Sequence, residues 1–155
     1  MSLSTRTLVL PLSCIGVLAC TSPAVRPPAD PTAIQAAAIL FLVHANTDQA
    51  PCVQVAVGPN EMTSGRVTKQ LQDPPGQLVN KLKRQAVAVR PFSSCSLAER
   101  RKVTYAIGWP RATARGVQIN ADRLCGSRCG EGSLLLVKDV GTEWRATEAE
   151  TTWIT

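Results

Sequence analysis

The stretch VTYAIGW, at residues 103–109, alternates large apolar side chains with smaller or polar ones, a pattern typical of a half-buried strand. Three more stretches of strand character follow it, at residues 117–122, 134–140 and 144–154. The sequence DVGT, at residues 139–142, predicts a hairpin turn between the last two. Because the helical patterns come first and the strands then follow one another, the order favours an antiparallel sheet over βαβ units.

Helical patterns precede these strands. A helix is predicted to begin at Pro31, with Asp30 as its cap. Its apolar residues recur at helical spacing, at Ile34, Ala38, Phe41 and Ala45. Residues 77–84 predict a short amphipathic helix, and residues 52–57 an additional strand. Residues 60–73 are expected to form an irregular loop and residues 86–89 a brief strand.

These patterns predict the α+β class. We expect an N-terminal helix and a short second helix packed on an antiparallel sheet of about four to five strands. Residues 32–155 have the length of a single domain. The chain has only two Phe, three Trp and one Tyr, so its core must be mostly aliphatic.

The segment MSLSTRTLVLPLSCIGVLAC, at residues 1–20, has the features of an export signal. Arg6 is its only charge, and an apolar run of about a dozen residues, Leu8 to Ala19, follows. That run is too short to span a bilayer, which needs roughly 20 residues. A charged start, a short apolar middle and a small-residue end predict a secretory signal peptide over residues 1–19.

The end of this segment, Val17-Leu18-Ala19-Cys20, resembles the lipobox of bacterial lipoproteins, in which a small residue precedes an obligatory cysteine. The resemblance implies that the Cys20 thiol becomes linked to diacylglycerol. It also implies cleavage before Cys20 and acylation of the new amino terminus, as with palmitate. Position 17 holds Val where Leu is commoner. The alternative is an ordinary cleaved signal peptide that leaves Cys20 unmodified.

The resemblance to lipoproteins implies a membrane anchor made of lipid. Two or three acyl chains hold a protein firmly, whereas one holds it only marginally. Residues 20–31 are then the lipidated cysteine and a Pro-rich tether, which could reach roughly 30 Å. In Gram-negative lipoproteins an Asp after the cysteine retains the protein at the inner membrane. The chain has Thr21 there, which implies the periplasmic face of the outer membrane if the host is Gram-negative.

Four cysteines remain once Cys14 is removed with the signal peptide and Cys20 is acylated: Cys52, Cys95, Cys125 and Cys129. An even number in an exported domain predicts disulfide bonds, and three pairings are possible. We favour Cys52–Cys95 and Cys125–Cys129. The first closes a loop of about 44 residues, which contributes on the order of 4 kcal/mol. Near the second, Gly126, Gly130 and Gly132 are expected to allow a tight backbone.

The later half of the chain resembles a group of small uncharacterised bacterial envelope proteins. The shared features are a short helix at residues 77–82, the segment VRPFSSC at residues 89–95 and a late C-G-x-x-C-G-x-G motif at residues 125–132. An aliphatic strand at residues 134–137 and a G-x-x-W sequence at residues 141–144 follow. The resemblance implies a shared fold and no activity, because no function is attached to the group.

The charge is strongly basic, at +6 for the whole chain. Most of the surplus lies in the middle, against only Glu99 and Asp122: Lys81, Lys83, Arg84, Arg90, Arg100, Arg101, Lys102, Arg111, Arg115, Arg123 and Arg128. Such a surface attracts nucleic acid, anionic lipid or acidic polymers. For an envelope protein nucleic acid is the least expected of these partners, and no aromatic residues alternate with the basic ones as a stacking platform would require, so we expect no nucleic acid. A solvated face that keeps the protein soluble is the simpler interpretation.

The chain contains few arrangements that could carry chemistry. Cys125 and Cys129 could form a redox pair beside Arg128, but thioredoxin-like pairs are C-x-x-C on a βαβ scaffold. No G-x-S-x-G accompanies the serines, and His44 is the only histidine. The cysteine spacing does not suit zinc. We therefore expect no catalytic residue, no metal and no cofactor.

The sequence thus predicts a non-enzymatic lipoprotein of the cell envelope that acts as a binding module of unknown ligand. The expected partners are the membrane, through lipid on Cys20, and an envelope protein or an anionic envelope polymer. One alternative is a periplasmic thiol-disulfide enzyme that uses Cys125 and Cys129. Another is an inhibitor or immunity-type protein directed against an exported enzyme.

Overall fold

The computed structural model describes residues 30–43, 50–59, 62–63, 66–67, 70–126 and 128–155. The expected signal peptide lies outside these ranges, as do Cys14, Cys20 and residues 21–29 of the expected tether. His44 and Ala45 also lie outside them.

Helices and short strands alternate up to residue 100, and longer strands follow. The first part contains α1 (Pro31–Val43), β1 (Cys52–Ala56), β2 (Met62–Thr63), β3 (Arg66–Val67), β4 (Leu71–Gln72), α2 (Gly76–Arg84), β5 (Arg90–Pro91), the 3-10 helix η1 (Phe92–Ser94) and α3 (Leu97–Arg100). The second part contains β6 (Thr104–Ile107), β7 (Arg111–Thr113), β8 (Gly116–Leu124), β9 (Gly130–Asp139) and β10 (Trp144–Ile154).

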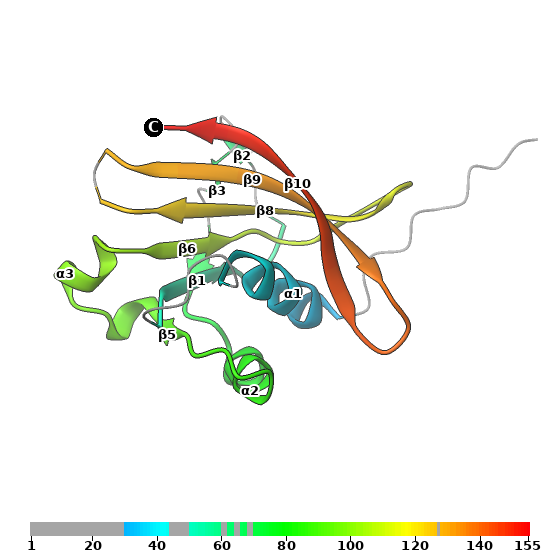
Figure 1. Ribbon diagram of the computed structural model, residues 1–155, viewed down its shortest axis with the longest axis horizontal. Coiled ribbons are helices and arrows are strands. Elements are labelled where there is room, and N and C mark those ends of the chain that lie inside the picture. Colours follow the sequence, from blue (N-terminus) through cyan, green and yellow to red (C-terminus); the bar gives the residue numbers. More distant parts are fainter. Residues whose placement is uncertain (1–29, 44–49, 60–61, 64–65, 68–69, 127) are drawn as a thin grey trace, which may run out of the picture.

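The main sheet is mixed and mostly antiparallel, and the α+β class is confirmed (Figure 1). Its order is β10-β9-β8-β6-β1-β4, with β5 paired to β1 and β7 paired to β8. The sheet has eight strands in the described part of the chain, and five of them are four residues or longer. The neighbouring strands β6 and β1 are parallel, as is the short pair β1 and β5, so the sheet is not purely antiparallel.

The four strands expected after residue 102 are confirmed as β6, β8, β9 and β10. The expected turn joins the last two: the Gly141 N–H donates to the Asp139 carboxylate at 2.9 Å, and Gly141 has a φ of 100°. β10 has two register shifts against β9, which allow the strand to bend across the side of the sheet where α1 lies.

Two expectations for the shorter elements were wrong. The region at residues 60–73 contains β2, β3 and β4 in place of a loop without strands. The brief strand expected at residues 86–89 lies instead at Arg90–Pro91, where β5 pairs with the start of β1. β4 and β5 pair with β1, which is distant in the sequence, and β2 and β3 are two residues each, so local alternation did not reveal these strands.

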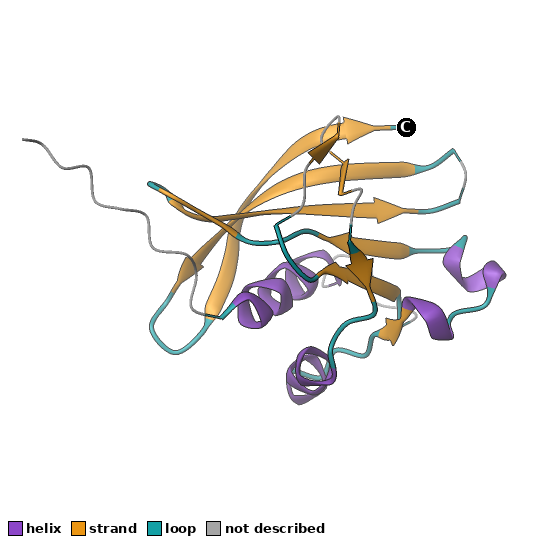
Figure 2. Cartoon of the chain, turned by 180° about the vertical axis from the view of Figure 1, so that it is seen from behind, coloured by secondary structure: helices purple, strands orange, loops and turns teal. Residues whose placement is uncertain are grey.

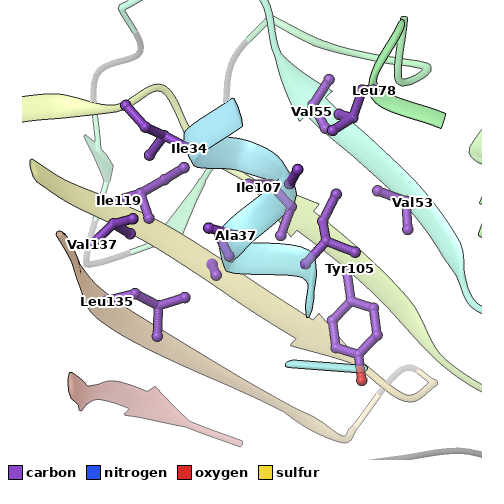
Figure 3. Close-up of a cluster of buried hydrophobic side chains, with 14 of the residues drawn as sticks. Ile34, Ala37, Val53, Val55, Leu78, Tyr105, Ile107, Ile119, Leu135 and Val137 are labelled. Atoms are coloured by element: carbon purple, nitrogen blue, oxygen red, sulfur yellow. The ribbon is translucent and has the colours of Figure 1, made fainter. Parts of the chain in front are cut away.

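The helix α1 lies in the centre of the core (Figure 3). Asp30 caps it, accepting a hydrogen bond from the Ala33 N–H at 2.9 Å, as the sequence predicts. All seven residues from Ala33 to Ile39 are buried, because the helix packs on one sheet face and also against α2 and β10. The sheet side chains beneath it include Tyr105, Ile107, Ile119, Leu135 and Val137. From α2, Leu78 and Leu82 complete the cluster.

Three hydrogen bonds reveal the direction in which α1 crosses the sheet. Near its start, the Gln35 side-chain Nε2 donates to the Ala56 carbonyl at 2.8 Å and to the Gly108 carbonyl at 3.2 Å, where β1 and β6 end. Near its end, the Tyr105 hydroxyl donates to the Leu42 carbonyl at 3.4 Å, close to the start of β6. The helix therefore runs antiparallel to β1 and β6.

This direction distinguishes two ends of the sheet. The hairpin end holds the start of α1, the ends of β1 and β6, and the hairpin of β7 and β8 that extends to the right in Figure 1. The α3 end holds η1 and α3, the starts of β1 and β6, and the loop at residues 125–129 between β8 and β9. A segment that precedes α1 joins the domain at the hairpin end.

The second face of the sheet, opposite α1, is covered in part by the β2–β3 hairpin, whose strand β3 packs against β8 (Figure 2). The buried residues that point to this face from β6 and β8 are small or polar, and they include Thr104, Ala106, Asn120 and Asp122. The two faces of the sheet therefore differ in chemistry, with an aliphatic core on one and buried polar groups on the other.

The side-chain amide of Gln35 provides a test of this core. We expect Gln35→Leu to lower the free energy of unfolding by about 1–3 kcal/mol, because the Ala56 and Gly108 carbonyls lose their buried donor. Chemical denaturation monitored by circular dichroism would measure the change. Gln77→Leu, at an exposed position of α2, is the matched control and should change the stability by less than about 0.5 kcal/mol. Equal free energies of unfolding for Gln35→Leu and Gln77→Leu would contradict a stabilising role of the two Gln35 hydrogen bonds.

Candidate functional site

The structure divides the basic middle of the sequence between separate parts of the surface. Arg111 and Arg115 lie on the β7–β8 hairpin at the hairpin end. Four others gather at the opposite, α3 end: Arg100, Arg101, Lys102 and Arg128. The basic residues of α2 are Lys81, Lys83 and Arg84, and they lie apart from both groups. The predicted basic stretch is therefore not one continuous surface, and its densest part is the α3 end.

A capping box builds α3. The Ser96 hydroxyl accepts a hydrogen bond from the Glu99 N–H at 3.3 Å, and the Glu99 carboxylate accepts one from the Ser96 N–H at 2.7 Å. Glu99 also forms an ion pair with Arg90, whose guanidinium donates to the Ser94 carbonyl at 3.0 Å. Hydrogen bonds from Ser96, and then Arg90, lower the pKa of Glu99 to about 2. The negative charge of Glu99 therefore interacts with Arg90 and Ser96 within the protein.

The second acid of this region, Asp73, is engaged in the same way. Its carboxylate accepts hydrogen bonds from the Ser93 hydroxyl and, at 2.9 Å, from the Ser93 N–H. These bonds are the main reason why the pKa of Asp73 is lowered, and the nearby charge of Arg100 adds to the effect. Asp73, although exposed, thereby links the segment before α2 to η1.

Two contacts show how the arginines of the α3 end are placed. The Arg100 guanidinium lies over the Phe92 ring, 4.1 Å from its centroid, which is a cation–π contact. The loop after β8 lies against the turn after α3, since a Cβ built on Gly126 would be 3.7 Å from the Arg101 carbonyl oxygen. Arg128 of that loop therefore lies on the same end as Arg101, and both side chains are exposed.

Both disulfides lie at this end, with the pairings that the sequence favours. Cys52, the first residue of β1, is bonded to Cys95, between η1 and α3, with a Cα–Cα distance of 6.2 Å. Cys52 is 2% exposed and Cys95 is 4% exposed. This bond links the central strand of the sheet to the segment that carries α3, so the short helix is covalently fixed to the core.

The second disulfide, Cys125–Cys129, closes the β8–β9 loop with a Cα–Cα distance of 4.9 Å. The Cys125 N–H donates to the Cys129 carbonyl at 2.9 Å, and Gly126 has a φ of 95°, which explains the glycine there. Cys129 is exposed and Cys125 is half-buried. The setting is a strand–loop–strand hairpin, which differs from the strand–helix setting of thioredoxin-like pairs.

The other two glycines of this motif have a role that the sequence analysis did not find. Gly130 and Gly132 lie in β9 beneath the indole ring of Trp153, which comes from β10. A Cβ on Gly132 would stand 2.0 Å from Trp153 Nε1, and one on Gly130 would stand 2.9 Å from Cη2. These glycines therefore make room for a tryptophan, and the expectation that they serve a tight turn was wrong. The signal available in the sequence was their spacing of two, which places them on one face of a strand.

The tryptophan reaches a buried acid. Trp153 Nε1 donates to the Asp122 carboxylate at 3.2 Å, and the backbone N–H of Val67 donates to its other oxygen at 2.8 Å. Asp122 is 3% exposed and is the only acidic or basic side chain in the buried set of the described residues. It thus joins β3, β8 and β10 across the second face of the sheet, and we assign it a structural role.

The remaining candidates for chemistry do not come together. Asp122 lies opposite Gly132, and its neighbour Arg123 lies opposite Glu131, so the side chains of Asp122 and Glu131 point to different faces of the sheet. Ser94 donates to the Pro91 carbonyl at 2.7 Å, while Ser127 and His44 lie outside the described residues. Within the described ranges, no three His, Cys, Asp or Glu side chains gather closely enough to hold a metal ion.

Comparisons with protein-family models, curated proteins and solved structures found no match to this chain. None of the helices in the described part of the chain combines the length and the apolar composition that a membrane-spanning helix requires. A function can therefore be inferred only from the residues of this chain. The α3 end is the candidate site because exposed basic side chains are concentrated there on segments that disulfides hold in place.

The contact between Trp153 and the two glycines can be tested by adding a methyl group at Gly132. We expect Gly132→Ala to destabilise the protein by about 2–4 kcal/mol, because the new methyl group displaces the indole from Asp122. Gly76→Ala is the matched control, since a Cβ there meets no atom within 4 Å. In a Trp153→Ala background the cost of Gly132→Ala should largely disappear. Thermal unfolding of the four variants would measure this coupling, and additive effects would contradict the contact.

The two disulfides should differ in their reaction with a mild reductant. We expect Cys125–Cys129 to open first in the folded protein, because attack on a disulfide requires access and Cys129 is exposed. Cys52–Cys95 should resist until the protein unfolds, since both residues are buried. Stepwise alkylation followed by mass spectrometry measures the order. Simultaneous reduction of both pairs under native conditions would contradict the difference in access.

Proposed function

We propose that this protein is a non-enzymatic lipoprotein of the cell envelope that holds a small disulfide-bonded binding domain on a lipid anchor. The observation that carries the proposal is the sequence VLAC at residues 17–20, at the end of a short apolar segment with a single positive charge before it. Acyl chains on Cys20 attach the protein to the membrane, on the periplasmic face of the outer membrane if the host is Gram-negative.

Two features of the domain support an exported location. Its four described cysteines are paired in disulfides, which persist in oxidising compartments outside the cytoplasm. The start of α1 lies at the hairpin end, so a tether from Cys20 enters there and leaves the α3 end on the opposite side. The α3 end, where the exposed basic side chains are densest, then points away from the lipid anchor.

The binding role follows from what the domain presents. Two acids of the α3 end, Asp73 and Glu99, are held by internal hydrogen bonds, and the exposed basic side chains there outnumber the remaining exposed acid, Glu131. The carboxylates of Asp122 and Glu131 point to different faces of the sheet and so do not form a catalytic pair. The expected partner is an envelope protein or an anionic envelope polymer.

The anchor is tested by Cys20→Ala, with Cys14→Ala as a matched control in the same leader. In a Gram-negative host, we expect the wild type and Cys14→Ala to incorporate an alkyne-labelled palmitate and to sediment with membranes. Cys20→Ala should lose the label and the membrane association, because the thiol that receives diacylglycerol is absent. Intact-mass measurement would locate the acyl groups on Cys20. Label retained in Cys20→Ala, or an intact precursor in the cytosol, would refute the proposal.

A further inference from the structure

We infer that the α3 end is a binding surface for a polymer that carries phosphate groups, with Arg100, Arg101 and Arg128 as its contact residues. The inference rests on the proposed function for the place where such a polymer is met, and it names the ligand class of that site. The surface combines α3, the turn that follows it and the β8–β9 loop, which are contributed by separate parts of the chain.

The first argument is the balance of charge at this end. Glu99 is paired with Arg90 and bonded to Ser96, and Asp73 is bonded to Ser93. In the part of the chain that the structure describes, the exposed guanidinium groups of Arg101 and Arg128 take part in no ion pair. Glu99 and Asp73 are thus engaged within the protein, Glu131 at the start of β9 is an exposed acid of the same end, and the charges of Arg101 and Arg128 are directed to solvent.

The second argument is preorganisation. A charged side chain that is already held in place loses less conformational entropy when it binds. Arg100 is stacked on Phe92 at 4.1 Å, and α3 is fixed by its capping box and by the Cys52–Cys95 disulfide. The Cys125–Cys129 disulfide restrains the loop that carries Arg128. The positive charges are therefore displayed on a rigid frame, which a merely solvated surface does not require.

The third argument is the chemistry of the cations. The three contact residues are arginines, whose planar guanidinium presents a fork of N–H donors that matches the oxygens of a phosphate group. Several such groups on one surface favour a ligand that repeats its negative charge along a chain over a single small anion. Lys102, next to Arg101, extends the same basic sequence.

The fourth argument is position, and it distinguishes a polymer from the anchoring bilayer. The α3 end lies opposite the start of α1, and α1 has 13 residues, a length of about 20 Å. A protein tethered through the start of α1 therefore presents the α3 end away from its own membrane. Anionic lipid of that membrane is better placed to meet the hairpin end.

The experiment measures binding of the full-length protein, purified in detergent, to long-chain inorganic polyphosphate by isothermal titration calorimetry. The test variant is Arg101→Glu with Arg128→Glu. The control is Arg111→Glu with Arg115→Glu, which changes the net charge by the same amount at the hairpin end. We expect the test variant to bind at least about tenfold more weakly and the control to change by less than about twofold. Affinity should fall as salt rises, since phosphate contacts release counterions.

Several results would overturn the inference: no binding by the wild type, equal losses in the two variants, equal binding of poly-glutamate, or binding to phosphatidylglycerol vesicles through Arg101 and Arg128 without binding to the polymer. Arg101→Gln with Arg128→Gln repeats the test if charge reversal perturbs folding, and circular dichroism monitors that. The assay uses purified protein and does not require Cys20 to be acylated. Its failure is therefore distinguishable from failure of the proposed anchor, which the Cys20→Ala experiment tests independently.

Discussion

The burial of residues 33–39 of α1 on every side of the helix is the constraint on which the rest of the structure depends. Seven consecutive residues from Ala33 to Ile39 have lost contact with solvent, and small alanines at positions 33, 36, 37 and 38 let the helix lie close to its neighbours. Gln35 is the polar exception, and its amide is satisfied by carbonyls at the ends of β1 and β6. This arrangement fixes the direction of the helix and so places its start at the hairpin end of the sheet and its last turn toward the α3 end.

Much of the fold could be predicted because its signals are local. Alternating side chains revealed β6 and β8, and Asp30 followed by Pro31 marked the start of α1. The helix α3 was missed, although Ser96 and Glu99 have the three-residue spacing of a capping box. The parallel pairing of β1 with β6 could not be predicted in this way, since the partner of a strand is decided by packing between segments nearly fifty positions apart.

The candidate site shows the same division between local and distant causes. The disulfide pairings could be favoured from spacing, whereas the split of the basic residues could not, because it depends on β6 and β8 crossing the sheet in opposite directions. Gly130 and Gly132 were recognised as a motif and given the wrong reason. The residue that requires them to be small, Trp153, lies more than twenty positions away on a neighbouring strand. A sequence motif can thus be recognised correctly even though the residue that explains it, here Trp153, belongs to another strand.

The order of the disulfides along the chain has a consequence for how the molecule acquires them. Among the four described cysteines, the first is joined to the second and the third to the fourth. If the chain enters an oxidising compartment from its amino terminus, each sulfur meets its correct partner as the next one to arrive. Random oxidation of four thiols would give this outcome in only one of three pairings. Entry in that order would therefore favour the observed pairing of these four cysteines over the two alternatives.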